Sequence, residues 1–198
     1  MHSMDDDVTR KVILLNGLPA TGKTTIGEQL SDRLNAPLIS LDTIKEAMFD
    51  VLGTGDREYN RLLGRACKKI IWALIADLPD RSLVIIDAWF GRAPHDDVVQ
   101  ALAESKVSDF VEIWCHAPGE VLKERYIARI GKRHAGHPGI EYGDELQQIA
   151  AEVAPMAIGA LYAVETSDMH KVDINSMICW VREQLRIPIM PGDQRCHE

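Results

Sequence analysis

The chain of 198 residues is long enough to bury a substantial apolar core but leaves little room for two full domains. Apolar residues make up 46% and charged residues 26% of it, a globular composition that excludes a disordered chain. The formal net charge of -8 disfavours a nucleic-acid partner, because the molecule as a whole repels polyanions.

The sequence contains no pattern typical of a membrane or exported protein. Its apolar runs are far shorter than the roughly 20 residues of a spanning helix, and residues 1–7 are acidic where a signal peptide would begin basic. The four cysteines, Cys67, Cys115, Cys179 and Cys196, form neither a CxxC pair nor a zinc-spaced cluster. We therefore expect a cytoplasmic protein with free thiols and no membrane partner.

Short β-branched runs alternate along the chain with longer amphipathic segments. This alternation is typical of an α/β fold in which βαβ units build a parallel sheet with helices on both faces. The runs are nearly continuously apolar, as strands buried on both faces are. We expect strands at Lys11–Asn16, Pro37–Leu41, Leu83–Asp87, Phe110–His116 and Ala160–Glu165. We expect helices at Lys23–Leu34, Thr43–Phe49, Asp56–Leu78, Pro94–Glu104, Pro118–Ile130, Gly143–Val153 and Ile174–Leu185.

No internal repeat or low-complexity linker divides the chain. We expect a single domain over residues 1–198, with tails prone to disorder at 1–9 and 188–198. In the long helix expected at 56–78, Trp72 lies among apolar residues at helical spacing, so we expect its side chain in the core.

A glycine-rich loop joins the first expected strand to the first expected helix. Residues 17–24 read Gly-Leu-Pro-Ala-Thr-Gly-Lys-Thr and match the phosphate-binding pattern G-x-x-x-x-G-K-[ST] at every fixed position. Loop amides and the positive end of the helix dipole then converge on an anion. Lys23 would contact the β- and γ-phosphates, and the Thr24 hydroxyl would bind Mg²⁺. The alternative, a glycine turn with a chance lysine, is disfavoured by the flanking strand and helix. We expect nucleotide contacts from Gly17, Leu18, Pro19, Ala20, Thr21, Gly22, Lys23, Thr24 and Thr25.

Asp42 directly follows the second expected strand, in Leu38-Ile-Ser-Leu-Asp42. Ligands of open parallel sheets bind at the carboxyl ends of the strands, so Asp42 should face the same crevice as the loop. A carboxylate there can accept the proton of an attacking substrate hydroxyl. The alternative is that Asp42 caps the helix expected at 43–49.

Asp87 ends an apolar run, Leu83-Val-Ile-Ile-Asp87, in the manner of a Walker B strand. Such a carboxylate can bind Mg²⁺ or orient the acceptor, and the alternative is a structural role at the strand end. Trp89 and Phe90 would either wall the substrate or cover the sheet. Arg92 would contact either substrate or only solvent. We include all four in the expected substrate site.

A cationic stretch from 124 to 137 stands out in this acidic chain. Arg125 and Arg129 share a helix face at i, i+4, and Arg133 follows. Gly131 and Gly136 would act as hinges of a mobile lid at about 125–142. Arginines on such a lid can close over a triphosphate and stabilise the charge that develops on the transferred group.

The alternative for this stretch is a solvated helix face that pairs with Glu120 and Glu124. Its two histidines, His134 and His137, have no third ligand at metal-binding spacing, and we assign them no metal.

Together these segments resemble the small P-loop kinases, most of all the chloramphenicol phosphotransferase-like group and its related AAA-type kinases. The resemblance covers most of residues 11–187. It rests on Asn16–Thr24, Leu41–Met48, Ile85–Phe90 and the arginine-bearing lid.

The resemblance implies a P-loop NTPase fold, a three-layer α/β/α sandwich around a five-stranded parallel sheet of order 2-3-1-4-5. It also implies ATP with Mg²⁺ as cofactors, Asp42 as the base, Arg129 and Arg133 with Lys23 as catalytic residues, and Arg125 on the nucleotide. The segment around Thr166 to Asp168 would lie near the adenine, with Thr166 among the nucleotide contacts. The phosphate-binding loop with the following Thr25–Gly27 is also similar to that of shikimate kinases. The Asp-x-Asp that follows their second strand is absent here, which weakens a sugar-acid kinase interpretation.

The sequence therefore predicts an ATP-dependent kinase that phosphorylates a hydroxyl of a small molecule, an antibiotic or another metabolite. One alternative is a kinase acting on a nucleotide, a nucleotide sugar or a nucleic-acid 5′ end. Another is a non-catalytic nucleotide switch. The oligomeric state is left open.

Overall fold

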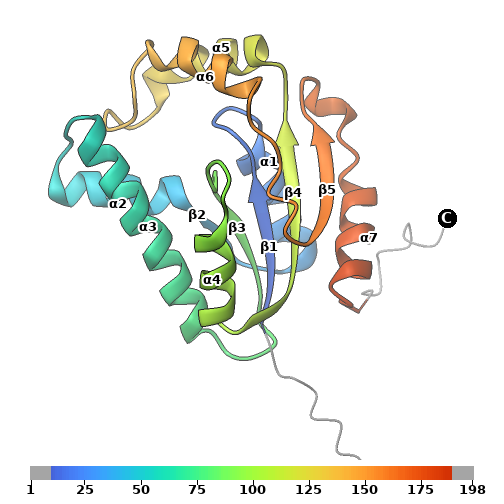
Figure 1. Cartoon of the computed structure of the whole chain (residues 1–198). Helices are drawn as coiled ribbons and strands as arrows, with labels where there is room; N and C mark the ends of the chain where they lie inside the picture. The colour runs from blue at the N-terminus through green and yellow to red at the C-terminus, as the bar shows by residue number, and fades with distance from the viewer. Residues whose placement is uncertain (1–9, 189–198) are drawn as a thin grey trace, which may run out of the picture.

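Five parallel strands form one sheet of order β2-β3-β1-β4-β5 in the computed structural model, which describes residues 10–188. The tails expected at 1–9 and 188–198 lie outside the described residues, apart from Pro188. β1 occupies the centre and pairs in parallel with β3 and β4 (Figure 1). This confirms the expected strand order. The strands are β1 (Arg10–Asn16), β2 (Leu38–Ser40), β3 (Leu83–Asp87), β4 (Val107–His116) and β5 (Ala160–Glu165).

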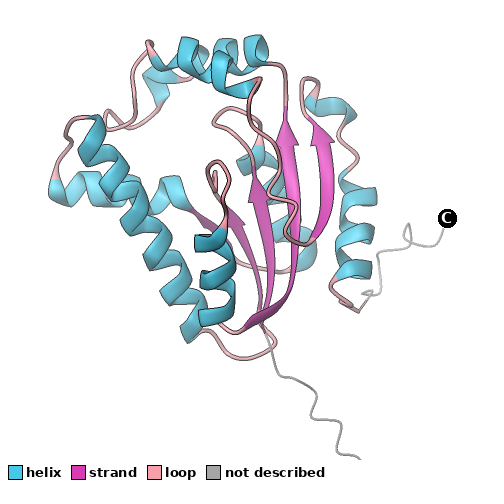
Figure 2. Cartoon of the chain, viewed as in Figure 1, coloured by secondary structure: helices cyan, strands magenta, loops and turns pink. Residues whose placement is uncertain are grey.

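Helices cover both faces of the sheet, which gives three layers (Figure 2). One face packs against α3 and α4, and the other against α1 and α7. The helices are α1 (Lys23–Leu34), α2 (Leu41–Leu52), α3 (Arg57–Asp77), α4 (Asp96–Glu104), α5 (Gly119–Ala128), α6 (Tyr142–Ala150) and α7 (Ile174–Gln184). Two short 3₁₀ helices are η1 (Ile130–Lys132) and η2 (Met169–Lys171).

The alternation of side chains along β1 explains why both faces are apolar. Val12 and Leu14 join one core cluster, whereas Ile13 and Leu15 join the cluster on the opposite face, and all four are fully buried. Successive residues of a strand point to opposite faces, so a strand covered on both sides reads as a continuous apolar run.

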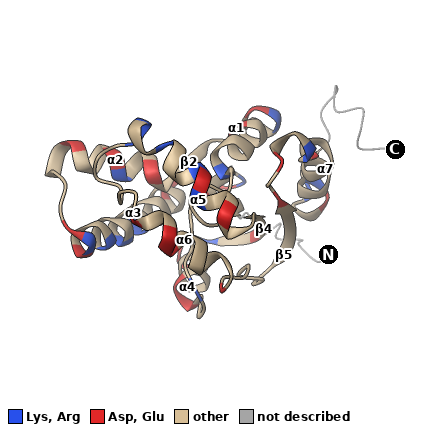
Figure 3. Ribbon diagram, turned by 90° about the horizontal axis from the view of Figure 1, so that it is seen from above, with Lys and Arg blue, Asp and Glu red and all other residues tan. Residues whose placement is uncertain are grey.

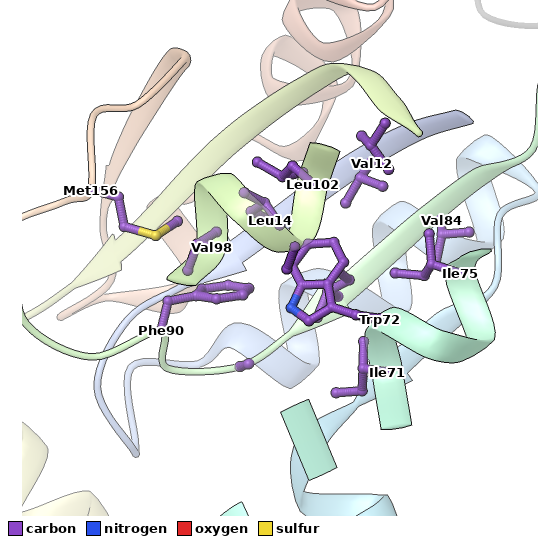
Figure 4. Close-up of a cluster of buried hydrophobic side chains, with 14 residues drawn as sticks. Val12, Leu14, Ile71, Trp72, Ile75, Val84, Phe90, Val98, Leu102 and Met156 are labelled. Carbon is purple, nitrogen blue, oxygen red and sulfur yellow. The ribbon is translucent and has the colours of Figure 1, made fainter. Parts of the chain in front are cut away.

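The core between the sheet and α3 contains Trp72, as expected, and also Phe90 (Figure 4). Trp72 is 8% exposed and Phe90 is 4% exposed. Phe90 follows β3, and its ring lies near Val98 of α4 and Met156 in this core cluster (Figure 4).

Helices α5 and α6 cross the carboxyl ends of the strands, above the glycine-rich loop (Figure 1). A third apolar cluster joins them to that loop, with Leu122, Tyr126 and Leu146 packed near Leu18 and Ala20. We refer to residues 119–150 as the α5–α6 segment.

Two expectations from the sequence are corrected by the structure. Cys179 is disulfide-bonded, so the prediction of free thiols holds for Cys67 and Cys115 but not for Cys179. Helix α2 begins at Leu41, two residues earlier than expected, because Ser40 takes the N-cap position in an extended conformation. No helix in the described part of the chain combines the length and apolarity required to span a bilayer.

Candidate active site

A cavity of about 830 Å³ opens at the carboxyl ends of the strands. Its walls are the glycine-rich loop, the end of β3, helices α2 and α3, and the α5–α6 segment. The expected residues that line it are Pro19, Ala20, Gly22, Lys23, Thr24, Thr25, Asp42, Asp87, Trp89, Arg92, Arg129 and Arg133. The fold therefore brings most of the predicted site together.

The glycine-rich loop is held in shape by its own backbone and by Asn16. Gly22 precedes α1 with a φ of +81°, a left-handed conformation that favours glycine, and an added Cβ would lie 2.7 Å from the sulfur of Met169. The Asn16 side-chain oxygen accepts hydrogen bonds from the amides of Gly17 (2.8 Å) and Phe90 (3.3 Å). Asn16 thus fixes the loop relative to the chain that leaves β3.

Lys23 lies at the first position of α1, and its ammonium group folds back over the loop. Nζ donates to the carbonyl of Leu18 at 2.8 Å. Burial lowers the pKa of Lys23, and the nearby Asp87 carboxylate opposes that shift. A desolvated cation beside loop amides is suited to a polyphosphate anion.

Thr24 and Asp87 meet although 63 positions separate them in the chain. The Thr24 hydroxyl donates to the Asp87 carboxylate at 2.8 Å. Asp87 is 5% exposed; burial raises its pKa, whereas Lys23 and the Thr24 hydrogen bond act in the opposite direction. A hydroxyl and a carboxylate oxygen side by side form a donor set that suits Mg²⁺. Both residues therefore fit the predicted metal role.

Asp42 lies in the first turn of α2 with its side chain 53% exposed and turned toward the cavity. The alternative interpretation of Asp42 as a helix cap is wrong, because Ser40 holds that position. The Asp42 carboxylate pairs with the Arg133 guanidinium at 2.8 Å.

The three arginines of the cationic stretch separate in space. Arg129 and Arg133 line the cavity, and burial, followed by the charge of Arg133, lowers the pKa of Arg129. Arg125 instead donates to the carbonyls of Thr166 (2.7 Å) and Ser167 (2.8 Å), away from the cavity lining. A solvated face for Arg129 and Arg133 is thereby excluded.

Burial places the side chains of three predicted site residues away from the cavity. Phe90 belongs to the core and does not wall the cavity. Thr166 is fully buried; its amide and hydroxyl donate to the carbonyl of His116 at 2.8 Å and 2.9 Å, so its side chain is not free to meet an adenine. The Leu18 side chain is buried beneath α5, so its predicted contact with the nucleotide would be made by its backbone.

Two other predicted residues that follow β3, Trp89 and Arg92, line the cavity. Trp89 lines the cavity, and its indole Nε1 is buried without a hydrogen-bond partner. Arg92 lines the cavity as well and forms a 2.8 Å ion pair with Glu152. Gly17 and Thr21 support the loop from outside the cavity lining.

The loop after η1 packs on α2. His137 Nε2 lies 2.7 Å from Glu46, and the His134 ring stacks on Phe49 with centroids 5.2 Å apart. An added Cβ at Gly136 would lie 2.4 Å from the Phe49 ring, so this glycine serves close packing. Within residues 10–188, no three His, Cys, Asp or Glu side chains gather as a metal-binding group.

Sequence reasoning missed the cations that α2 and α3 contribute. Lys45, Arg65 and Lys68 all line the cavity. Lys45 lies about one turn after Asp42 on α2, so helical spacing from the predicted base was a signal available for Lys45. Arg65 and Lys68 belong to α3, and their approach to the cavity depends on how that helix packs.

The parallel sheet with its phosphate-binding loop, and the Thr24–Asp87 pair beside that loop, define the fold of the P-loop kinases. The sequence matches the family model described as "AAA domain" over residues 12–141, and the chain belongs to this family.

Solved structures agree with this assignment. A candidate kinase from Chloroflexus aurantiacus j-10-fl is 32% identical, with a TM-score of 0.80 over 89% of this chain and 99% of that chain. Shikimate kinase from Bacteroides thetaiotaomicron (19% identity, TM-score 0.56, 90% of this chain and 99% of that one) shares the fold. A gluconokinase from Sinorhizobium meliloti 1021 shares it as well (19% identity, TM-score 0.52, 90% of this chain and 91% of that one). No curated protein matches the sequence.

Proposed function

We propose that the protein is an ATP-dependent phosphotransferase that transfers the γ-phosphoryl group to a hydroxyl of a small molecule. One observation carries the proposal: Lys23, the Thr24–Asp87 pair and Asp42 all face one cavity at the carboxyl ends of the strands. The similarity to a candidate kinase at 32% identity supports it.

The loop residues would hold the nucleotide. Backbone amides of residues 20–24 and the ammonium of Lys23 would bind the phosphates, and the oxygens of Thr24 and Asp87 would hold Mg²⁺. When bound, the metal ion supplies positive charge that neutralises phosphate oxygens.

Asp42 would orient the acceptor and take its proton. The acceptor oxygen forms the new bond to the γ-phosphorus, the bond from that phosphorus to the β–γ bridging oxygen breaks, and the hydroxyl proton passes to the Asp42 carboxylate. Arg129 and Arg133 would stabilise the charge on the transferred group, with residues 125–142 as the lid that excludes water.

The acceptor is tested by measuring ADP release from ATP and Mg²⁺ against a panel of hydroxyl compounds, with mass spectrometry of the products. The panel includes chloramphenicol, because the resemblance to that phosphotransferase group makes an antibiotic alcohol one candidate. A gain of 80 Da in an alcohol together with stoichiometric ADP supports the proposal. Tight nucleotide binding without acceptor-dependent turnover across the panel would instead favour a nucleotide switch.

A further inference from the structure

The site cavity carries positive charge in a chain of net charge -8. Within residues 10–188, nine Lys and Arg side chains line it against four Asp and Glu. Three of those carboxylates already pair with lining arginines: Asp42 with Arg133, Glu145 with Arg57, and Glu152 with Arg92. Seen from above the strands, basic residues follow α3 along one side of the site (Figure 3). Of the other lining cations, Lys45, Arg61, Arg65 and Lys68 come from α2 and α3.

Lys45 is the most buried of these cations, at 9% exposure. Its ammonium donates to the side-chain oxygen of Asn60 on α3 and lies 5.8 Å from the centroid of the Phe49 ring. Burial lowers the pKa of Lys45, with Asp42 opposing the shift. The side-chain partner that receives its hydrogen bond is neutral, and an ammonium has three protons to donate.

Lys68 lies two turns after Asn60 on the same stripe of α3. Its ammonium donates to the carbonyl of Phe90 at 3.0 Å, again a neutral acceptor. Burial lowers the pKa of Lys68, with Asp97 opposing the shift. No carboxylate of residues 10–188 forms an ion pair with Lys45 or Lys68. Two partly desolvated cations thus face the cavity without a counter-charge in contact, an arrangement that an incoming anion stabilises.

Gly64 leaves the cavity wall open beside Lys45. It occupies the position midway between Asn60 and Lys68 in the i, i+4, i+8 stripe. An added Cβ there would meet, within 4 Å, only the Lys45 ammonium, at 3.8 Å. A side chain at this position would extend toward the Lys45 ammonium and reduce the open space beside it.

We propose that Lys45 and Lys68, on either side of Gly64, bind an anionic group, a carboxylate or a phosphate, on the acceptor alcohol. The identification of the bound anion as part of the phosphoryl acceptor rests on the proposed function. The existence of the anion site does not. Asp42 and Lys45 are three residues apart on α2, so their Cβ atoms lie roughly 5–6 Å apart on one face of the helix. The substrate class is a small hydroxy acid or a phosphorylated alcohol, and not a neutral antibiotic.

The test uses anions alone, so it does not require the acceptor to be known. Protein saturated with AMP-PNP and Mg²⁺, which fills the glycine-rich loop, is titrated by calorimetry with inorganic phosphate and separately with acetate. We expect saturable binding of at least one of them. Lys45→Met and Lys68→Met should each weaken it 10-fold or more, while Lys69→Met, an exposed neighbour outside the cavity, leaves it unchanged.

Each outcome decides the proposal. Binding of phosphate alone assigns a phosphorylated acceptor, and binding of acetate assigns a carboxylate. The proposal is overturned if neither anion binds saturably. It is also overturned if Lys69→Met weakens anion binding as much as Lys45→Met and Lys68→Met do. If AMP-PNP does not bind, the proposed function fails. The anion site is then tested separately, by titrating Lys23→Ala protein with the same anions and comparing it with the Lys23→Ala, Lys68→Met double variant. Circular dichroism confirms that each variant is folded.

Discussion

The Arg133 guanidinium lies 2.8 Å from the Asp42 carboxylate and joins the loop after η1 to the first turn of α2. Both elements line one cavity. The Arg133 side chain is 14% exposed and that of Asp42 53%. A proposed base and a proposed transition-state cation are thus held within reach of each other, and each can be tested separately.

Asp42→Asn should lower turnover about 100-fold or more, because the amide cannot accept the hydroxyl proton. Nucleotide affinity should stay within about twofold, since Asp42 does not belong to the glycine-rich loop. ADP release with the acceptor found in the panel, together with calorimetry of AMP-PNP, measures both. Asp50→Asn is the matched control, an exposed carboxylate on the same helix that pairs with His134. Equal turnover of the two variants would remove the base role.

Arg133→Met should lower turnover by about 100-fold, because one positive charge near the transferred group is lost. The neighbouring Lys132 is exposed and lies outside the cavity lining, so Lys132→Met should retain nearly full activity. Steady-state ADP release separates the variants. A loss confined to Lys132→Met, or shared by both, would contradict the assignment.

Asp87→Asn should make the protein more stable at pH 7 than the native sequence while abolishing the magnesium dependence of nucleotide binding. Burial raises the folded-state pKa of Asp87 above its ordinary 3.8. As pH rises, Asp87 therefore loses its proton at a lower pH in the unfolded chain than in the folded chain. Between these two pKa values the native protein loses stability as pH rises, whereas the asparagine variant has no proton to lose there.

Urea unfolding at pH 4 and at pH 7, without added metal, tests this expectation. The stability of the variant relative to the native protein should increase between the two pH values. A relative stability that falls instead would show that ionised Asp87 stabilises the fold.

Phe90→Ala should lower the free energy of unfolding by about 3–5 kcal/mol, because it empties a well-packed core position. Val99→Ala on α4 removes a half-exposed side chain and should cost less than about 1 kcal/mol. Urea midpoints of the two variants provide the comparison. Near-equal midpoints would mean that Phe90 is not part of the core.

The fold followed from the sequence because its signals are local. The five apolar runs each became a strand, and the pattern from Gly17 to Thr24 became the expected loop and helix start. Asp87 was placed correctly in the cavity because a residue at the end of a parallel strand must lie at the ligand edge of the sheet.

Positions just beyond a strand or on another helix were not determined by local pattern. Trp89 and Phe90 are adjacent, yet Trp89 turns to the cavity and Phe90 to the core, because the Phe90 amide is held by Asn16. Thr166 is polar but fully buried against β4. Lys68 was overlooked because its approach to the carbonyl of Phe90 depends on how α3 packs.

The most direct test of the account is calorimetric titration of the protein with AMP-PNP and Mg²⁺, compared with Lys23→Ala and with the exposed control Lys69→Ala. We expect saturable binding to the native protein and to the control, and a roughly 10- to 100-fold weaker affinity in Lys23→Ala, the loss of one charged hydrogen bond. Equal affinity in Lys23→Ala, or no binding to the native protein, would contradict the assignment of residues 17–24 as the nucleotide site.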